Sequence, residues 1–128
     1  MLYQFIVATI TVLILDAIWI SSQITSYTKV TETIQGMKMT VRWIPAIITY
    51  GLILLGLYLI LLYSQCQSSK LKVMLFAFLF GLVSYGIYNF TNLALLNKYT
   101  WTIAVKDTLW GGILLSVSIG LAIYLVKK

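Results

Sequence analysis

The sequence contains no histidine, one cysteine and only three acidic residues among its 128 positions. Structural zinc, haem and iron–sulfur centres take their protein ligands mainly from these residue types, so the chain lacks a ligand set for any of them. A Ser-His-Asp triad is excluded because histidine is absent, and the lone Cys66 cannot form a disulfide within the chain. We therefore expect no metal and no cofactor, and we rank enzymes below binding and transport proteins.

Charge is also scarce, since charged residues make up 9% of the chain and hydrophobic residues 61%. A soluble domain carries about 25% charged residues, so an ordinary soluble fold is excluded. The formal net charge is +6, but the basic residues stand near the ends of apolar runs and form no dense stripe. That placement is typical of a membrane protein, and it favours the lipid bilayer over nucleic acid as the partner.

Four apolar runs account for most of the chain, and each is long enough to cross a hydrocarbon core of about 30 Å. Short polar segments connect the later runs, so these are expected to be antiparallel neighbours with both chain ends on one side of the membrane. The sequence predicts an all-α fold, a single transmembrane domain over residues 1–128 built as a four-helix antiparallel bundle in the cell membrane. The helices are expected at about residues 2–24, 43–63, 71–96 and 102–126.

The segment Thr25–Val41, between the first two runs, has an amphipathic pattern. Apolar side chains such as Val30 and Ile34 recur at helical spacing, while Lys29 falls on another face. This pattern predicts an interfacial amphipathic helix that lies flat at the level of the lipid headgroups. The alternative is a solvated loop, which Gly36 and the threonines of the segment favour.

Two acids lie inside the predicted helices, where an ionisable side chain costs about 2.5–3.5 kcal/mol even on the mildest insertion scale. At about 1.5 Å per residue, Asp16 lies about 12 Å from the end of the first helix. Asp107 lies near the start of the fourth helix, which begins on the side where the first helix ends. The same count places further polar side chains in this half of the membrane: Tyr50, Tyr85, Tyr88, Asn89 and Asn92.

These residues predict a polar pocket in one half of the membrane, because polar faces are not stable against lipid and should turn inward to meet. The polar residues of the third helix share one face, as do Asp16 with Trp19 and Asp107 with Trp110. Glycines in the second, third and fourth helices are expected to let the helices pack closely below this pocket. We expect Trp43 to line this pocket as well. The candidate ligand-binding residues are Asp16, Trp19, Tyr50, Tyr85, Tyr88, Asn89, Asn92, Asp107 and Trp110.

Several of these residues belong to short motifs. They are Asp16 with Trp19, the pattern Y-x-x-Y-N-x-T-N over residues 85–92, and D-x-x-W-G over residues 107–111. With these motifs in this order, the chain resembles a family of small predicted membrane proteins, domain of unknown function 2177, over essentially its whole length. The resemblance implies four helices around a shared polar core, in the cytoplasmic membrane of bacteria, and supplies no established activity. It also implies an aspartate where this chain has Asn89, so one charge of that core is missing here.

The leading functional prediction is a binding or transport protein for a small or lipid-like molecule. Asp16 would select a cationic or hydrogen-bonding group, and the aromatic residues would line the apolar part of the site. One alternative is a proton or cation pathway, which needs a homo-oligomer because the half of the chain near the termini offers few polar groups. Two further candidates are a lipid-modifying enzyme, with Asp16 or Asp107 as general acid or base, and a structural membrane protein in which Asp16 fixes helix register.

Overall fold

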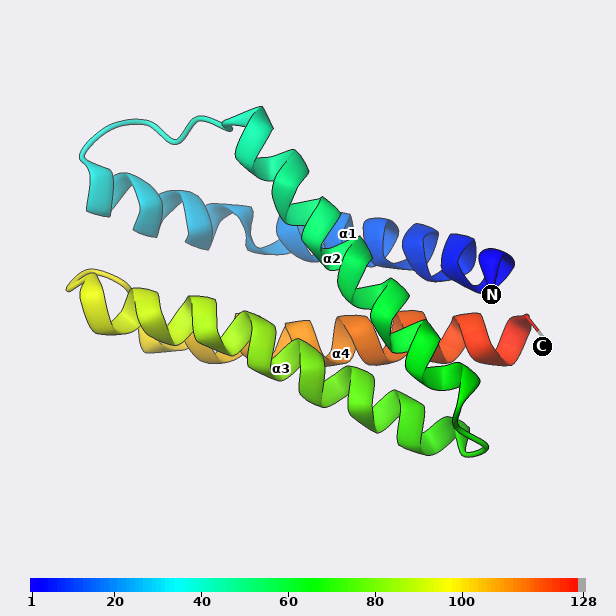
Figure 1. Ribbon diagram of the computed structural model, residues 1–128. Helices are drawn as coiled ribbons and strands as arrows, with labels where there is room; N and C mark the ends of the chain where they lie inside the picture. Colours follow the sequence, from blue (N-terminus) through cyan, green and yellow to red (C-terminus); the bar gives the residue numbers. More distant parts are fainter. Residues whose placement is uncertain (127–128) are drawn as a thin grey trace.

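The computed structural model describes residues 1–126, so residues 127 and 128 of the predicted domain lie outside it. The described chain folds into four α-helices, with a short connection between each helix and the next (Figure 1). Each helix is long and apolar enough to cross a membrane, which confirms the predicted all-α class. The helices are α1 Leu2–Gln35, α2 Trp43–Gln65, α3 Lys70–Leu95 and α4 Trp101–Leu125.

The start of α1 and the end of α4 lie side by side at one end of the bundle (Figure 1). The Gln4 side-chain amide donates a hydrogen bond to the backbone carbonyl of Val126 at 3.1 Å and ties these two helix ends together. The α2–α3 connection lies at the same end, and the other two connections lie at the opposite end. We refer to these as the terminal end and the distal end of the bundle.

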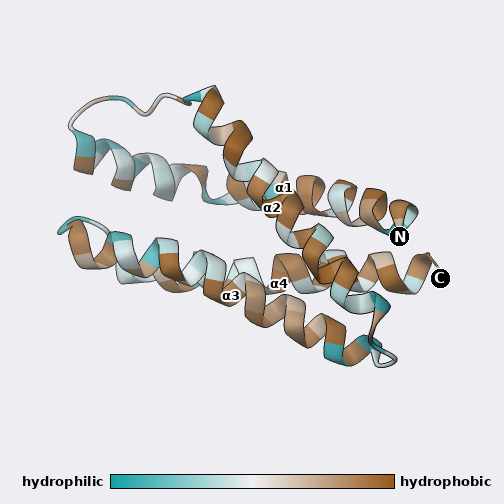
Figure 2. Cartoon of the chain, in the orientation of Figure 1, coloured by the Kyte–Doolittle hydropathy of each residue, from teal (hydrophilic) through white to brown (hydrophobic). Residues whose placement is uncertain are grey.

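At the distal end, α1 extends much further than the apolar run in the sequence indicates. It has 34 residues, or about 50 Å at about 1.5 Å per residue, and it ends at Gly36, whose φ of 71° lies in the left-handed region that glycine favours. Because the segment contains no earlier glycine or proline to stop the helix, Thr25–Gln35 continues α1 and does not form a separate interfacial helix. Figure 2 shows that this last part of α1 is more hydrophilic than the part before it.

The apolar core lies in the half of the bundle toward the terminal end, and α4 is its central helix. Eleven residues of α4 are buried, against four in α1, five in α2 and four in α3. The core residues come from all four helices and include Val12, Leu57, Ala77 and Ile119. Lipid tails are as apolar as these side chains, so close van der Waals packing holds this half together more than the exclusion of water does.

Glycines allow α3 and α4 to approach closely, as the sequence predicts. A Cβ atom added to Gly81 would lie 2.6 Å from the carbonyl carbon of Gly111 and 2.9 Å from the Cα of Gly112. A Cβ atom added to Gly112 would lie 2.8 Å from the ring of Phe78. At these positions a hydrogen atom is the largest side chain that the helix contact accepts.

We predict that Gly81→Ala separates α3 from α4 and lowers the free energy of unfolding by about 3 kcal/mol, since overpacking against backbone cannot relax through a rotamer change. The control is Gly51→Ala, because a Cβ atom at Gly51 has no neighbour within 4 Å. That variant should be more stable by about 0.5 kcal/mol through its better helix propensity. Unfolding by sodium dodecyl sulfate in detergent micelles measures both, and an equal effect of the two substitutions would contradict the close helix contact.

Candidate functional site

Asp16 of α1 joins three helices in the distal half of the bundle. Its side chain is buried, with 6% of the residue exposed. The hydroxyl of Tyr50 in α2 donates to Oδ2 at 2.7 Å, and the indole N–H of Trp110 in α4 donates to Oδ1 at 3.3 Å. Both carboxylate oxygens therefore have a donor from a different helix.

Asp107 of α4 has an equivalent pair of donors. The hydroxyl of Tyr27, in the distal part of α1, donates to Oδ1 at 2.7 Å, and the amide of Asn89 in α3 donates to Oδ2 at 2.7 Å. Asn89 is fully buried and donates a second hydrogen bond to the backbone carbonyl of Tyr85 at 2.9 Å. This second acid thus joins α1, α3 and α4.

Two stacked tryptophans connect the surroundings of the two acids. The rings of Trp19 and Trp110 are nearly parallel, at 7°, with their centroids 4.7 Å apart. Trp110 donates to Asp16, as described above, while Trp19 donates its indole N–H to the hydroxyl of Tyr27 at 3.1 Å. Because Tyr27 in turn donates to Asp107, the polar contacts run from one acid to the other through the indole pair.

Tyr99 extends these contacts to the α3–α4 connection. Its hydroxyl donates to Oδ1 of Asn89 at 2.7 Å. Burial raises the pKa of Tyr99 to about 12, so the hydroxyl remains protonated and keeps donating throughout the physiological pH range. We call the connected set the distal network: Asp16, Trp19, Tyr27, Tyr50, Asn89, Tyr99, Asp107 and Trp110.

Neutral donors satisfy both acids of the distal network. Within residues 1–126, neither Asp16 nor Asp107 forms an ion pair with a lysine or an arginine, and their hydrogen bonds come from tyrosine, tryptophan and asparagine. A hydrogen bond to a charged group contributes about 1.5–3 kcal/mol, so two donors offset much of the cost of burying each acid. Within the same residues, no group of acids and cysteines is placed to hold a metal ion.

Six of the nine predicted residues belong to the distal network: Asp16, Trp19, Tyr50, Asn89, Asp107 and Trp110. Tyr85 lies beside it, because its backbone carbonyl accepts from Asn89 and its ring lies against Gly111 of α4. Asn92 lies near the hydroxyl of Tyr99. The sequence therefore identified most of the side chains that meet in this half of the bundle.

The structure does not bring Tyr88 or Trp43 into the distal network. Tyr88 is 62% exposed and Trp43 is 73% exposed, so both face away from the bundle. Tyr88 follows the same i, i+3, i+4 spacing as the buried residues of α3, but the contact face of α3 is narrower than that spacing implies. Trp43 is the first residue of α2, in the half of this helix that has no buried residue.

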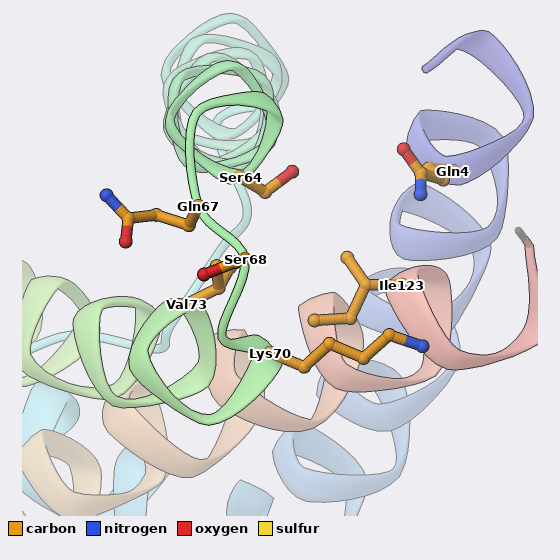
Figure 3. A pocket seen from close by; sticks show the side chains of 7 residues that line it. All are labelled: Gln4, Ser64, Gln67, Ser68, Lys70, Val73 and Ile123. Atoms are coloured by element: carbon orange, nitrogen blue, oxygen red, sulfur yellow. The ribbon is translucent and has the colours of Figure 1, made fainter. Parts of the chain in front are cut away.

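Two hollows of the described chain lie away from the nine predicted residues. The larger, of about 340 Å³, is at the terminal end and is lined by residues that include Gln4, Ser64 and Lys70 (Figure 3). The smaller, of about 220 Å³, lies between Ile34 and the α3–α4 connection near Lys98. At the distal network, the stacked indoles and the hydrogen-bonded side chains contact one another directly where the sequence predicts a polar pocket.

Sequence reasoning missed Tyr27 and Tyr99. The predicted interfacial helix separates Tyr27 from Asp16, whereas in an unbroken helix 11 residues make about three turns and place both on one face. Reading α1 as continuous up to Gly36 would therefore have identified Tyr27. Tyr99 lies in a connection, where no helical period indicates the direction of a side chain.

Comparison with known proteins identifies a family at the level of the sequence. The sequence profile of a family described as "Predicted membrane protein (DUF2177)" matches residues 1–124, a range that holds every residue of the distal network. No curated protein and no solved structure matches the chain. The family description gives a membrane location and names no activity, so an activity has to be argued from the site itself.

We predict that Tyr27→Phe lowers the free energy of unfolding by about 1–2 kcal/mol, because Asp107 loses a donor and Trp19 loses its acceptor. Tyr3→Phe is the matched control, since Tyr3 is 72% exposed and removing its hydroxyl should change stability little. Unfolding by sodium dodecyl sulfate in one detergent measures both variants. Equal stability of the two would show that the Tyr27 contact contributes nothing to the bundle.

Proposed function

This chain belongs to the DUF2177 family of predicted membrane proteins and is a multi-pass membrane protein, and from that premise we propose that it binds or transports a small or lipid-like molecule whose hydrogen-bond donor or cationic group pairs with Asp16. The observation that carries the proposal is the hydrogen bond between Tyr50 and Asp16. That bond joins a weakly packed half of one helix to an acid that is otherwise enclosed.

The two halves of α2 differ in how they pack. All of its buried residues lie between Gly56 and Ser64, in the half toward the terminal end. The half toward the distal end is mostly exposed and leans away from α1 and α3 (Figure 1). Within residues 1–126, the hydrogen bond from Tyr50 to Asp16 is the only one that joins this half of α2 to another helix.

We call the hydrogen bond between Tyr50 and Asp16 the latch, because its opening would release the distal half of α2. The α2 half that carries Tyr50 has no buried residue, so opening this hydrogen bond would uncover Asp16 at little further cost in packing. A ligand that donates a hydrogen bond or carries a cation replaces the Tyr50 hydroxyl at the same carboxylate oxygen. The hydrogen bond from Tyr50 to the carboxylate is then replaced by a ligand bond of similar free energy.

The surroundings of the latch suit a molecule that arrives through the bilayer. Exposed apolar side chains stand next to Tyr50 along α2, among them Ile48 and Leu52. The stacked indoles beside Asp16 add a large aromatic surface, of the kind that binds cationic or apolar groups. These features favour a partly apolar ligand with one polar group over a fully hydrated ion.

A structural role is the second candidate, and a specific observation favours it. Both carboxylate oxygens of Asp16 already have donors, and satisfied polar contacts of this kind fix helix register in some bundles. A proton pathway within one chain is less favoured, because the contact between the two acids passes through stacked indole rings, which neither release nor take up a proton at physiological pH. An enzyme would need a reacting group beyond the two acids and the tyrosines.

We predict that Asp16→Asn reduces the amount of a specific co-purifying molecule at least about tenfold per mole of folded protein, because the charged acceptor is lost. Mass spectrometry of the gently extracted protein measures this amount. Tyr50→Phe is the matched variant, since it removes the competing donor and leaves Asp16 in place. The same molecule should be retained by Tyr50→Phe in equal or greater amount.

The structural candidate predicts another pattern. In that case Asp16→Asn and Tyr50→Phe lower the unfolding midpoint by similar amounts, and neither changes what co-purifies. Asp107→Asn is the control, because it disturbs the distal network at its second acid and leaves Asp16 in place. Loss of the molecule in Asp107→Asn to the same extent as in Asp16→Asn would contradict the assignment of the binding group to Asp16.

A further inference from the structure

The hollow of about 340 Å³ at the terminal end is separate from the distal network and is formed by all four helices. Most of the residues that line it are polar, with Val73 and Ile123 as the apolar members and Lys70 as the charged one. The full lining is Gln4 of α1, Ser64 of α2, Gln67 and Ser68 of the α2–α3 connection, Lys70 and Val73 of α3, and Ile123 of α4 (Figure 3).

Two of the lining side chains are polar groups buried within the outermost turns of their helices. Gln4 and Ser64 are each only 2% exposed, and Figure 3 shows the Ser64 hydroxyl directed toward the helix that carries Gln4. The Gln4 amide donates to the Val126 carbonyl at 3.1 Å. An amide nitrogen carries two hydrogens, so Gln4 retains a second donor for a ligand.

The charge at this end is positive. The Lys70 ammonium lies 4.3 Å from the centre of the Tyr124 ring, a cation–π contact that holds it on the α4 side of the hollow. Lys70 is also the first residue of α3, where the helix dipole is positive. The three acids of the chain lie elsewhere, Asp16 and Asp107 in the distal network and Glu32 in the distal part of α1.

We propose that this hollow binds the phosphate of an anionic phospholipid headgroup. The Lys70 ammonium pairs with the phosphate, and the second hydrogen of the Gln4 amide donates to it as well. Val73 and Ile123 offer an apolar surface to the glycerol part of the lipid, whose acyl chains remain in the bilayer. A volume of about 340 Å³ is enough for a headgroup phosphate and its glycerol.

Position favours a lipid over a soluble ligand. The hollow lies where the helices end and α2 connects to α3, which is the level of the headgroups for helices that span the bilayer. Leu71 of α3 and Leu125 of α4 are exposed apolar residues that closely follow the lining residues Lys70 and Ile123 in the sequence. They would contact the acyl chains. The site differs from the proposed Asp16 site in its residues, in its charge and in the end of the bundle at which it lies.

Native mass spectrometry of the full chain tests this proposal, with phosphatidylglycerol or phosphatidylcholine supplied in the micelles. The wild type should retain phosphatidylglycerol in preference to phosphatidylcholine. Lys70→Gln should lower that retention about fivefold, the factor that one lysine contributes to binding an anionic lipid surface. Lys72→Gln is the matched control, because Lys72 lies in the same turn of α3 and does not line the hollow.

Three outcomes would overturn the proposal. The first is equal retention of the two lipids, and the second is an equal loss in Lys70→Gln and Lys72→Gln, which indicates general attraction to a basic surface. The third is Lys70-dependent binding of inorganic phosphate to the delipidated protein without binding of phosphatidylglycerol, which makes a free phosphate the ligand. Asp16→Asn should leave phosphatidylglycerol retention unchanged, so this test and the test of the Asp16 site can fail independently.

Discussion

An acid placed inside a hydrocarbon layer is costly unless polar groups surround it, and this chain places two acids in one half of its bundle. Their requirement for donors accounts for much of the distal half. It explains why α1 continues far enough to bring Tyr27 to Asp107, why the indole N–H of Trp110 points at Asp16, and why Asn89 is fully buried. Helices that share donors around two acids cannot shift in register without losing several hydrogen bonds at once.

The half toward the terminal end is held by a different kind of contact. There the core side chains are small or aliphatic, and next to this core, near the middle of the bundle, the backbones of α3 and α4 meet through Gly81 and its partners. Close packing of this kind is rigid, whereas the distal part of α2 depends on one hydrogen bond from Tyr50. The bundle therefore combines a firmly packed half with a half in which α2 has few buried side chains, and the hydrogen bond from Tyr50 joins that part of α2 to Asp16.

The sequence was sufficient for the number of helices, their approximate bounds and most of the residues of the distal network, because hydropathy and helical spacing determine these features directly. It did not predict the length of α1, since an amphipathic pattern fits both a flat interfacial helix and the continuation of a spanning one. It also did not predict which side chains stack against one another in the folded bundle. Spacing indicates which residues of α3 share a face, but whether the indoles of Trp19 and Trp110 stack depends on rotamers that only the folded bundle determines.

Asn89 shows how one such residue bears on function. The family resemblance leads us to expect an aspartate at this position, and a second carboxylate within hydrogen-bond distance of Asp107 would need a proton between the two oxygens. The asparagine amide supplies its own hydrogens instead, one to Asp107 and one to the carbonyl of Tyr85. The contact at this end of the distal network therefore does not depend on proton uptake. A mechanism that moves protons through Asp107 loses that partner here, while the hydrogen bonds of Asp16 are unaffected, which supports the proposal that Asp16 is the binding group.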